Sequence, residues 1–352
     1  MRKNGSPDLG GRAMTIVVNM RTGVDPRKIR IAARFILNGK LVAFPTETVY
    51  GLGADALNPD AVKRIFEAKG RPPDNPLIIH IADFRDLKRV ARDIPKEAKL
   101  LAEKFWPGPL TMVLPKADEV PPVTTGGLDT VAVRMPAHPI ALALIKASTP
   151  VAAPSANISG KPSPTSADHV VDDFYGRIEV IIDGGETNIG VESTVIDLSS
   201  ERPMLLRPGG LPLEEIEATI GPVEIHPAVK GKTVDMARAP GMKYRHYSPN
   251  AQVIVVEGPS NRVRRKIEEL VREYRSMGYR VGVMAREEIS ADEFYFLGKT
   301  PADVARNLFK ALRELDKRGV DVIIAEGIEE KGIGLAVMNR LKKASGYRVV
   351  KA

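Results

Sequence analysis

The chain of 352 residues contains no cysteine and only five histidines. Without cysteine it cannot form a disulfide, bind a metal through thiolates or use a cysteine nucleophile. The histidines are scattered, at His80, His138, His169, His226 and His246, and show no paired metal-ligand spacing. Any metal is therefore expected to arrive as Mg²⁺ on the phosphates of a nucleotide rather than in a protein cage.

Long apolar runs are also lacking. None approaches the ~20 residues that span a bilayer, and the N-terminus has no signal-peptide core. We therefore expect a cytoplasmic protein that does not bind a membrane. Its net charge of +8 suits an anionic partner, either nucleotide phosphates or RNA. Because there is no dense basic block or aromatic-rich RNA-binding signature, we expect direct RNA binding to be weak or absent.

Length and patterning predict two α/β domains. Residues 1–14 are expected to be a disordered tail, with Met14 as an alternative start, and residues 15–222 to form the first domain. Residues 223–250 lack apolar periodicity, which predicts a linker. Residues 251–352 alternate strand and helix patterns, as in a small domain with a parallel sheet. Neither G-x-G-x-x-G nor G-x-x-x-x-G-K-[ST] occurs in the chain.

The first domain is expected to be organised around residues 43–53, Ala-Phe-Pro-Thr-Glu-Thr-Val-Tyr-Gly-Leu-Gly. An apolar strand ends at Pro45, which has no N–H with which to continue a strand ladder. Polar side chains follow, and Gly51 and Gly53 allow the backbone to approach a ligand closely. Taken alone, these residues fit an ordinary Pro/Gly turn equally well.

Several other strands end in similar polar loops. One loop carries Lys69 and Arg71 among prolines, which hold the two cations in place at little entropic cost. The strand 130–134 ends at Arg134, and arginine is the side chain suited to bidentate recognition of carboxylate or phosphate. Because at least five strands end in this way, we predict a single concave polar site. His80, inside an apolar strand, is by itself more typical of a core residue.

Seven segments, in order, closely resemble the signatures of the YrdC-type threonylcarbamoyl-AMP synthases. They are Phe44–Gly53, Lys69–Pro72 with Asn75–Leu77, Trp106–Thr111, Val133–Pro136, Pro154–Asn157, Glu192–Val195 and Leu206–Gly209. The resemblance covers about residues 15–222, and residues 223–352 resemble the linker and extra domain of the family's long form. It implies a twisted mixed sheet with a concave basic face, followed by a smaller Rossmann-like α/β domain.

The resemblance implies a reaction in which L-threonine, bicarbonate (or CO₂) and ATP give L-threonylcarbamoyl-AMP and pyrophosphate. The product would supply a downstream transferase that modifies the adenosine beside the anticodon in tRNA. In this chemistry a carbamate formed on the threonine amine attacks the α-phosphate. Positioning and charge neutralisation, rather than a protein nucleophile, should therefore carry the catalysis.

The resemblance also implies residue roles. L-Threonine would be bound by Thr48, His80, Arg134 and Ser193, which replaces the interpretation of His80 as a core residue. ATP would be bound by Lys69, Arg71, Asn75, Thr130, Ser155, Asn157, Ser163, Arg207, His246 and Tyr247. Lys69 and Arg71 would be the catalytic residues at the triphosphate, and His246 or Tyr247 would close over the nucleotide. Glu47 would either pair with an arginine or help to hold Mg²⁺.

Two other functions are weighed against this one. Carbamoyltransferases of hydrogenase maturation contain a YrdC-like module, but they normally carry cysteine motifs, and this chain has no cysteine. The second is an RNA-binding module, whose affinity should fall steeply with salt. A synthase, by contrast, should release pyrophosphate from ATP only when threonine and bicarbonate are present.

Overall fold

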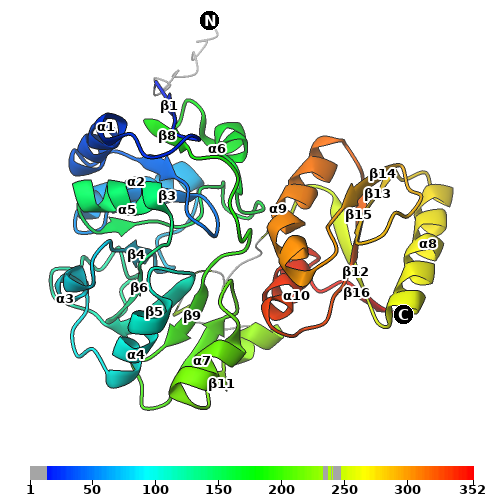
Figure 1. Ribbon diagram of the computed structural model, residues 1–352. Helices are drawn as coiled ribbons and strands as arrows, with labels where there is room; N and C mark the ends of the chain where they lie inside the picture. The colour runs from blue at the N-terminus through cyan, green and yellow to red at the C-terminus, as the bar shows by residue number, and fades with distance from the viewer. Residues whose placement is uncertain (1–13, 233–236, 239, 241–246) are drawn as a thin grey trace, which may run out of the picture.

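The computed structural model describes residues 14–232, 237–238, 240 and 247–352. These residues form two α/β domains that lie side by side (Figure 1). The predicted tail, apart from Met14, and part of the predicted linker lie outside the described residues. Within the described part of the chain, no helix is both long enough and apolar enough to cross a membrane.

The N-terminal domain is built on an 11-stranded sheet. Its strands, in spatial order, are β1 (Ile16–Asn19), β8 (Val180–Asp183), β2 (Val42–Phe44), β3 (Gly51–Asp55), β7 (Val151–Ala152), β4 (Ile78–His80), β6 (Thr130–Arg134), β5 (Leu110–Pro115), β9 (Thr194–Asp197), β10 (Met204–Arg207) and β11 (Glu224–Ile225). Parallel pairs, such as β1 with β8, occur beside antiparallel pairs, such as β2 with β3. The prediction of a mixed sheet is therefore confirmed.

The helices of this domain pack on the sheet through apolar faces. They are α1 (Pro26–Leu37), α2 (Pro59–Lys69), α3 (Leu87–Val90), α4 (Lys96–Phe105), α5 (Pro139–Ala147), α6 (Ala167–Phe174) and α7 (Leu213–Ile220), with 3₁₀ turns at Phe84–Asp86 and Pro227–Lys230. Asp25 and Asn58 cap α1 and α2, and each is followed by a proline in the first turn. The sequence did not reveal α6 or α7, because two turns are too few for a clear helical period.

Strand register brings the ends of the central strands together. His80 of β4 pairs with Arg134 of β6, and Arg134 pairs in turn with Thr111 of β5. These three residues therefore lie side by side across the sheet. Thr111 also pairs with Val195 of β9, so Ser193 enters the same row of strand ends. Residues distant in sequence meet here because the sheet aligns them.

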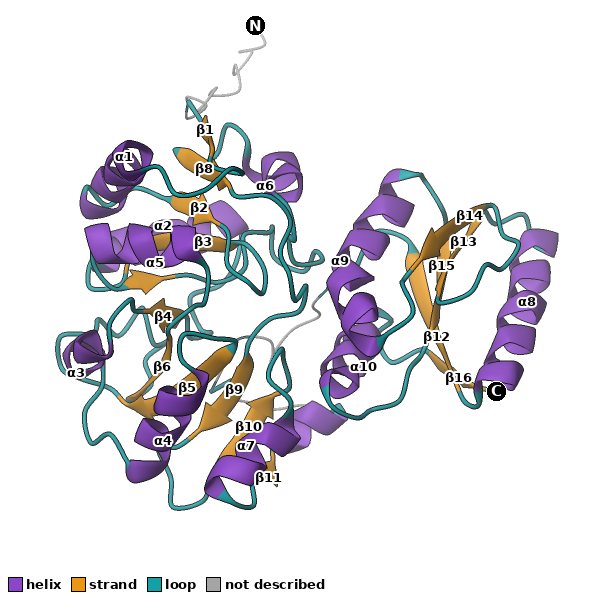
Figure 2. Ribbon diagram, viewed as in Figure 1, coloured by secondary structure: helices purple, strands orange, loops and turns teal. Residues whose placement is uncertain are grey.

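The C-terminal domain has a five-stranded parallel sheet. Its order is β14 (Glu293–Phe296), β13 (Val281–Ala285), β15 (Val322–Glu326), β12 (Gln252–Glu257) and β16 (Val349–Lys351). Helix α8 (Ser260–Ser276) covers one face, whereas α9 (Pro301–Lys317) and α10 (Ile333–Ala344) cover the face toward the N-terminal domain (Figure 2). The predicted parallel sheet is confirmed, with β16 as an additional short strand.

The two domains share an apolar core. Val49 and Val191 of the N-terminal domain belong to the same buried cluster as Leu308 and Phe309 of α9. Tyr247 lies in this cluster and stacks on Phe309, with ring centroids 5.3 Å apart. The N-terminal sheet also continues beyond residue 222, because β11 pairs with β10.

The N-terminal core offers a stability test, because the chain's single tryptophan, Trp106, is buried in it. Ile65 of α2 is fully buried in the same core. We expect Ile65→Ala to lower the free energy of unfolding by about 2–5 kcal/mol, since it removes three buried carbons and leaves a cavity. Urea unfolding followed by Trp106 fluorescence measures this change.

The matched control is Leu37→Ala, because Leu37 at the end of α1 is 53% exposed. Its free energy of unfolding should stay within about 0.5 kcal/mol of wild type. Equal losses in the two variants would contradict the placement of Ile65 in the core.

Candidate active site

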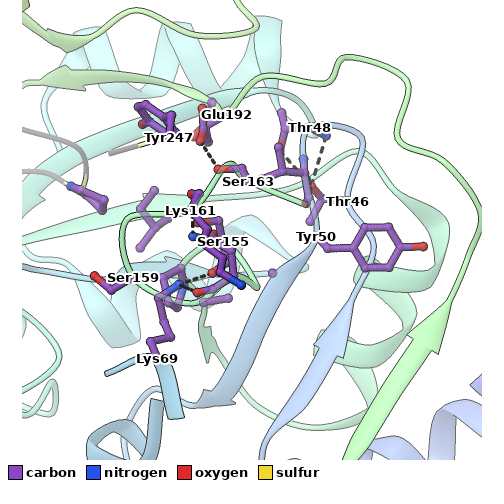
Figure 3. Close-up of a pocket in the computed structure, with 18 of the residues that line it drawn as sticks. Thr46, Thr48, Tyr50, Lys69, Ser155, Ser159, Lys161, Ser163, Glu192 and Tyr247 are labelled. Carbon is purple, nitrogen blue, oxygen red and sulfur yellow. Dashed lines mark hydrogen bonds between the residues drawn. The ribbon is translucent and has the colours of Figure 1, made fainter. Parts of the chain in front are cut away.

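A cavity lies where the polar loops of the N-terminal domain meet (Figure 3). With its open mouth it encloses about 740 Å³. It is lined by Thr46, Thr48, Val49, Tyr50, Gly51, Lys69, Arg71, Ile78, His80, Arg134, Ala153, Pro154, Ser155, Asn157, Ser159, Gly160, Lys161, Ser163, Glu192, Ser193, Arg207, Pro240 and Tyr247. Thr46 and Thr48 lie on one side, and Lys69 and Ser159 lie on the other.

Arg134 is the centre of one side of the cavity and is almost completely buried. Its Nη1 donates to the hydroxyl of Thr48 at 2.8 Å, and its Nη2 donates to Glu47 Oε1 at 2.5 Å. Its Nε donates to the carbonyl of Gly108 at 3.2 Å. The guanidinium is therefore held on three sides. Of the two roles expected for Glu47, the structure shows the ion pair with an arginine.

His80 and Ser193 flank Arg134. His80 is buried, and within the described residues its Nδ1 has no hydrogen-bond partner. Burial and the positive charge of Arg134 lower the pKa of His80 to about 3, so its imidazole is neutral at physiological pH. The hydroxyl of Ser193 lies 2.8 Å from that of Thr111. This side of the cavity thus presents a buried cation, a neutral imidazole and hydroxyl groups.

Lys69, the last residue of α2, is hydrogen-bonded to the loop that follows β7. Its Nζ donates to the carbonyl of Ser155 and, at 2.6 Å, to that of Asn157. Burial, together with the charge of Arg71, lowers the pKa of Lys69 well below its ordinary value. A phosphate group beside Lys69 would raise this pKa again, because it would stabilise the ammonium form.

Glu192 is a buried carboxylate on the wall of the cavity. Its Oε1 accepts from the hydroxyl of Ser163 at 2.6 Å, and its Oε2 accepts from Nε of Arg340 at 2.7 Å. Burial alone would raise the pKa of Glu192, but Arg340, Arg207 and the Ser163 hydroxyl lower it to about 2. Glu192 is therefore ionised at neutral pH. Figure 3 shows the ring of Tyr247 beside it.

Arg207 closes the same wall from β10. Its Nε and Nη2 donate to the carbonyl of Ser193 at 3.2 and 2.9 Å, and its Nη1 donates to the carbonyl of Pro240 at 3.2 Å. The cavity therefore combines Lys69, Arg71, Arg134 and Arg207 with few carboxylates. Such a set can hold a ligand that carries several negative charges.

Comparison with known proteins identifies the family. A family model described as telomere recombination matches residues 34–209, and one described as threonylcarbamoyl-AMP synthase, C-terminal domain, matches residues 211–346. The chain is 70% identical to the threonylcarbamoyl-AMP synthase of Pyrococcus abyssi, over 96% of this chain and 100% of that protein. It is 52% identical to that of Bacillus subtilis, over 93% of this chain and 95% of the relative. The chain belongs to the threonylcarbamoyl-AMP synthases.

The fold leads to the same family. The crystal structure of P. abyssi Sua5 complexed with L-threonine is similar to this structure with a TM-score of 0.95 and 69% identity. The similarity covers 96% of this chain and 99% of that chain. The resemblance of the sequence motifs to threonylcarbamoyl-AMP synthases is therefore confirmed, together with the two-domain α/β architecture.

Most of the residues expected to bind substrates in this synthase line the one cavity. They are Thr48, Lys69, Arg71, His80, Arg134, Ser155, Asn157, Ser163, Ser193, Arg207 and Tyr247. Their gathering agrees with the predicted roles, which themselves stay predictions. His246 lies outside the described residues.

Asn75 and Thr130 do not line the cavity. Asn75 lies behind Arg71, whose Nη2 donates to the Asn75 carbonyl at 3.3 Å. Its buried amide group has no hydrogen-bond partner among the described residues. Thr130 begins β6, whereas Arg134 ends it, so the two lie about 13 Å apart along the strand. The structure therefore does not bring Thr130 to the other predicted residues.

Glu192 and Arg340 were not predicted as site residues. Glu192 stands inside a family motif, but its partner lies 148 residues away in α10. The spacing of residues along α10 nevertheless indicates that Arg340 is buried. Ala336, Arg340 and Ala344 recur every four residues and are all buried, so Arg340 falls on the apolar face of its helix. A charged residue in that position predicts a buried partner.

The environment of His80 gives a testable consequence. Because its folded-state pKa is about 3, the imidazole should stay neutral and should not titrate between about pH 5 and pH 8. Imidazole NMR resonances recorded across this range, with His80 assigned by a His80→Asn variant, measure this. A midpoint near the ordinary histidine value would contradict the burial of this side chain.

Proposed function

We propose that the chain makes L-threonylcarbamoyl-AMP and pyrophosphate from L-threonine, bicarbonate (or CO₂) and ATP. The observation that carries this proposal is the set of side chains that line the cavity of Figure 3. A fixed arginine with hydroxyls and a neutral imidazole suits an amino acid, whereas the neighbouring cations and polar loops suit a triphosphate. Family membership and the L-threonine complex of the P. abyssi relative support the proposal.

In the proposed threonine subsite, Arg134 receives the carboxylate. Its guanidinium is already held by Glu47 and Thr48, so little entropy is lost on binding. Thr48, Ser193 and the free Nδ1 of His80 provide hydrogen bonds for the hydroxyl and amine of the ligand. A site that must bond the hydroxyl discriminates strongly against amino acids that lack it.

In the proposed nucleotide subsite, Lys69 and Arg71 face the triphosphate and act as the catalytic residues. Arg207 adds a further cation, and Ser155, Asn157 and Ser163 supply polar contacts from one loop. Mg²⁺ would enter on the ATP phosphates and neutralise part of their charge. The described residues include no group of three or more histidine or acidic side chains that could hold a metal by themselves.

The proposed chemistry needs no protein nucleophile. The threonine amine adds to CO₂ and loses a proton, which gives a carbamate. A carbamate oxygen then forms a bond to the α-phosphorus in line with the bond that breaks, and pyrophosphate leaves with that electron pair. Lys69 and Arg71 would stabilise the charge on the phosphate oxygens, while the cavity holds the two substrates close together.

The product would serve tRNA modification in the cytoplasm. A separate transferase would move the threonylcarbamoyl group to the adenosine beside the anticodon. The chain itself would not need to bind tRNA tightly. Steeply salt-dependent RNA binding without threonine-dependent turnover would favour the RNA-binding alternative instead.

The central test is substrate dependence. Pyrophosphate release from ATP should require both L-threonine and bicarbonate, because the attacking oxygen belongs to the carbamate formed from them. A coupled pyrophosphate assay with each substrate omitted in turn measures this requirement. Release that does not depend on threonine would rule out the proposed reaction.

Arg134→Lys tests the division of the cavity. The lysine keeps a positive charge near Glu47 but loses the fork of donors, so a charged hydrogen bond worth about 1.5–3 kcal/mol is lost. The KM for L-threonine should rise about 10- to 100-fold, while the KM for ATP changes less than about twofold. Steady-state kinetics with each substrate varied measures both values. A larger effect on ATP would show that the two subsites are reversed.

A further inference from the structure

Two arginines of the C-terminal domain reach the loop that carries Ser163. Arg313 of α9 donates through Nε and Nη2 to the carbonyl of Pro162, at 3.1 and 2.7 Å. Its Nη2 also donates to Asp173 at 2.9 Å. The carboxylate of Asp173 accepts from the amide of Ile158, in the same loop, at 3.1 Å. Arg313 therefore holds this loop both directly and through Asp173.

Arg340 of α10 reaches the next residue of the loop through a carboxylate. Its Nε donates to Glu192, which accepts from the hydroxyl of Ser163 through its other oxygen. Its Nη1 donates to Asn339 at 2.8 Å, and its guanidinium lies 5.4 Å from the ring centre of Tyr247. Arg340 is fully buried although it belongs to another domain. The C-terminal domain thus supplies the countercharge for a carboxylate on the cavity wall.

The N-terminal domain also holds this loop: Lys69 Nζ donates to the carbonyl of Asn157 at 2.6 Å, and Lys161 Nζ pairs with Asp173 at 3.3 Å. Within the loop, Nδ2 of Asn157 donates to the carbonyls of Ile158 and Lys161 at 2.8 and 3.1 Å.

Residues 157–163 form no strand or helix, and they include Gly160 at φ +89°. The backbone N–H of Ser159 donates to the carbonyl of Lys69 at 3.0 Å. The backbone N–H of Ser248 donates to the carbonyl of Gly160 at 2.8 Å. At the Ser163 end of this loop, the C-terminal domain contacts the Pro162 carbonyl directly through Arg313 and reaches the Ser163 hydroxyl through Arg340 and Glu192.

We propose that Arg340 is a positioning residue for the reaction: by holding Glu192, it fixes the Ser163 hydroxyl and the adjoining loop in the orientation that receives the nucleotide. Arg313 fixes the preceding peptide in the same way. The C-terminal domain thereby supports from behind a site whose lining residues come from the N-terminal domain and the linker. The inference deepens the proposed function and rests on it, because it assigns Ser163 and its loop to the nucleotide.

A purely structural role for Arg340 predicts a different result. Removing one partner of a buried ion pair destabilises a protein, because the other charge is left without compensation. Removing both charges restores much of that loss. Stability and nucleotide affinity should therefore recover together if Arg340 serves stability alone, and they should separate if Arg340 positions the loop.

The experiment compares Arg340→Gln with the double variant Arg340→Gln/Glu192→Gln in the full-length protein. We expect the single variant to lower the melting temperature and to raise the KM for ATP about 10-fold. In the double variant, the melting temperature should recover while the KM for ATP stays raised at least about fivefold. Calorimetric L-threonine binding should stay within about twofold of wild type in both, since Arg134 and His80 are untouched.

Arg340→Lys provides a conservative rescue, because the ammonium keeps the charge opposite Glu192. Its KM for ATP should lie between those of wild type and the single glutamine variant. Lys310→Gln is the matched control, since it removes an exposed ion pair with Glu186 across the same domain interface. Its KM for ATP should equal that of wild type.

Hydrogen–deuterium exchange supplies a readout that does not depend on turnover. Amides of residues 157–163 should exchange faster in the double variant than in wild type without any ligand present. Unchanged exchange and unchanged KM for ATP, or a KM that recovers together with the melting temperature, would overturn the inference. A wild-type protein that releases no pyrophosphate with threonine and bicarbonate would instead overturn the proposed function, and the inference would fall with it.

Discussion

Buried charge is the constraint on which the cavity depends. Lys69, Arg134, Arg207 and Arg340 are all nearly inaccessible to solvent, and a buried cation is tolerated only where oxygen atoms replace its water. Lys69 finds such oxygens on the loop after β7 and Arg134 finds them beside β2, whereas Arg207 and Arg340 share the segment before β9. Satisfying these four side chains therefore fixes the loops of two domains relative to one another.

The partners of these cations are unequal in charge. Arg134 and Arg340 each pair with a carboxylate, whereas Lys69 and Arg207 donate to carbonyl and hydroxyl oxygens. Neutral dipoles satisfy donors without cancelling charge, so the cavity retains a positive potential. Donors fixed in this way before a ligand arrives need little rearrangement during a reaction, which is the condition for electrostatic stabilisation of a transition state.

Much of this arrangement could be predicted from the sequence, because it depends on patterns within short stretches of the chain. Polar loops after apolar strands indicated the site, and alternating strand and helix patterns indicated the second domain. Register and cross-domain pairing could not be predicted, because they depend on contacts between distant segments. Thr130 begins the strand that Arg134 ends, and only Arg134 lines the cavity. The helical period places Arg340 on the buried face of α10, but only the folded structure identifies Glu192 as its partner.

The boundary between the two family models falls at about residue 210, but the N-terminal sheet does not end there. Helix α7 packs against α4, and β11 pairs with β10, although both belong to the segment matched by the second model. A gene truncated at that boundary would leave β10 as an open edge with unpaired backbone groups, a surface that promotes aggregation. The segment matched by the second model therefore contributes α7 and β11 to the first domain. The boundary between the two family models is not the boundary between the two folded domains.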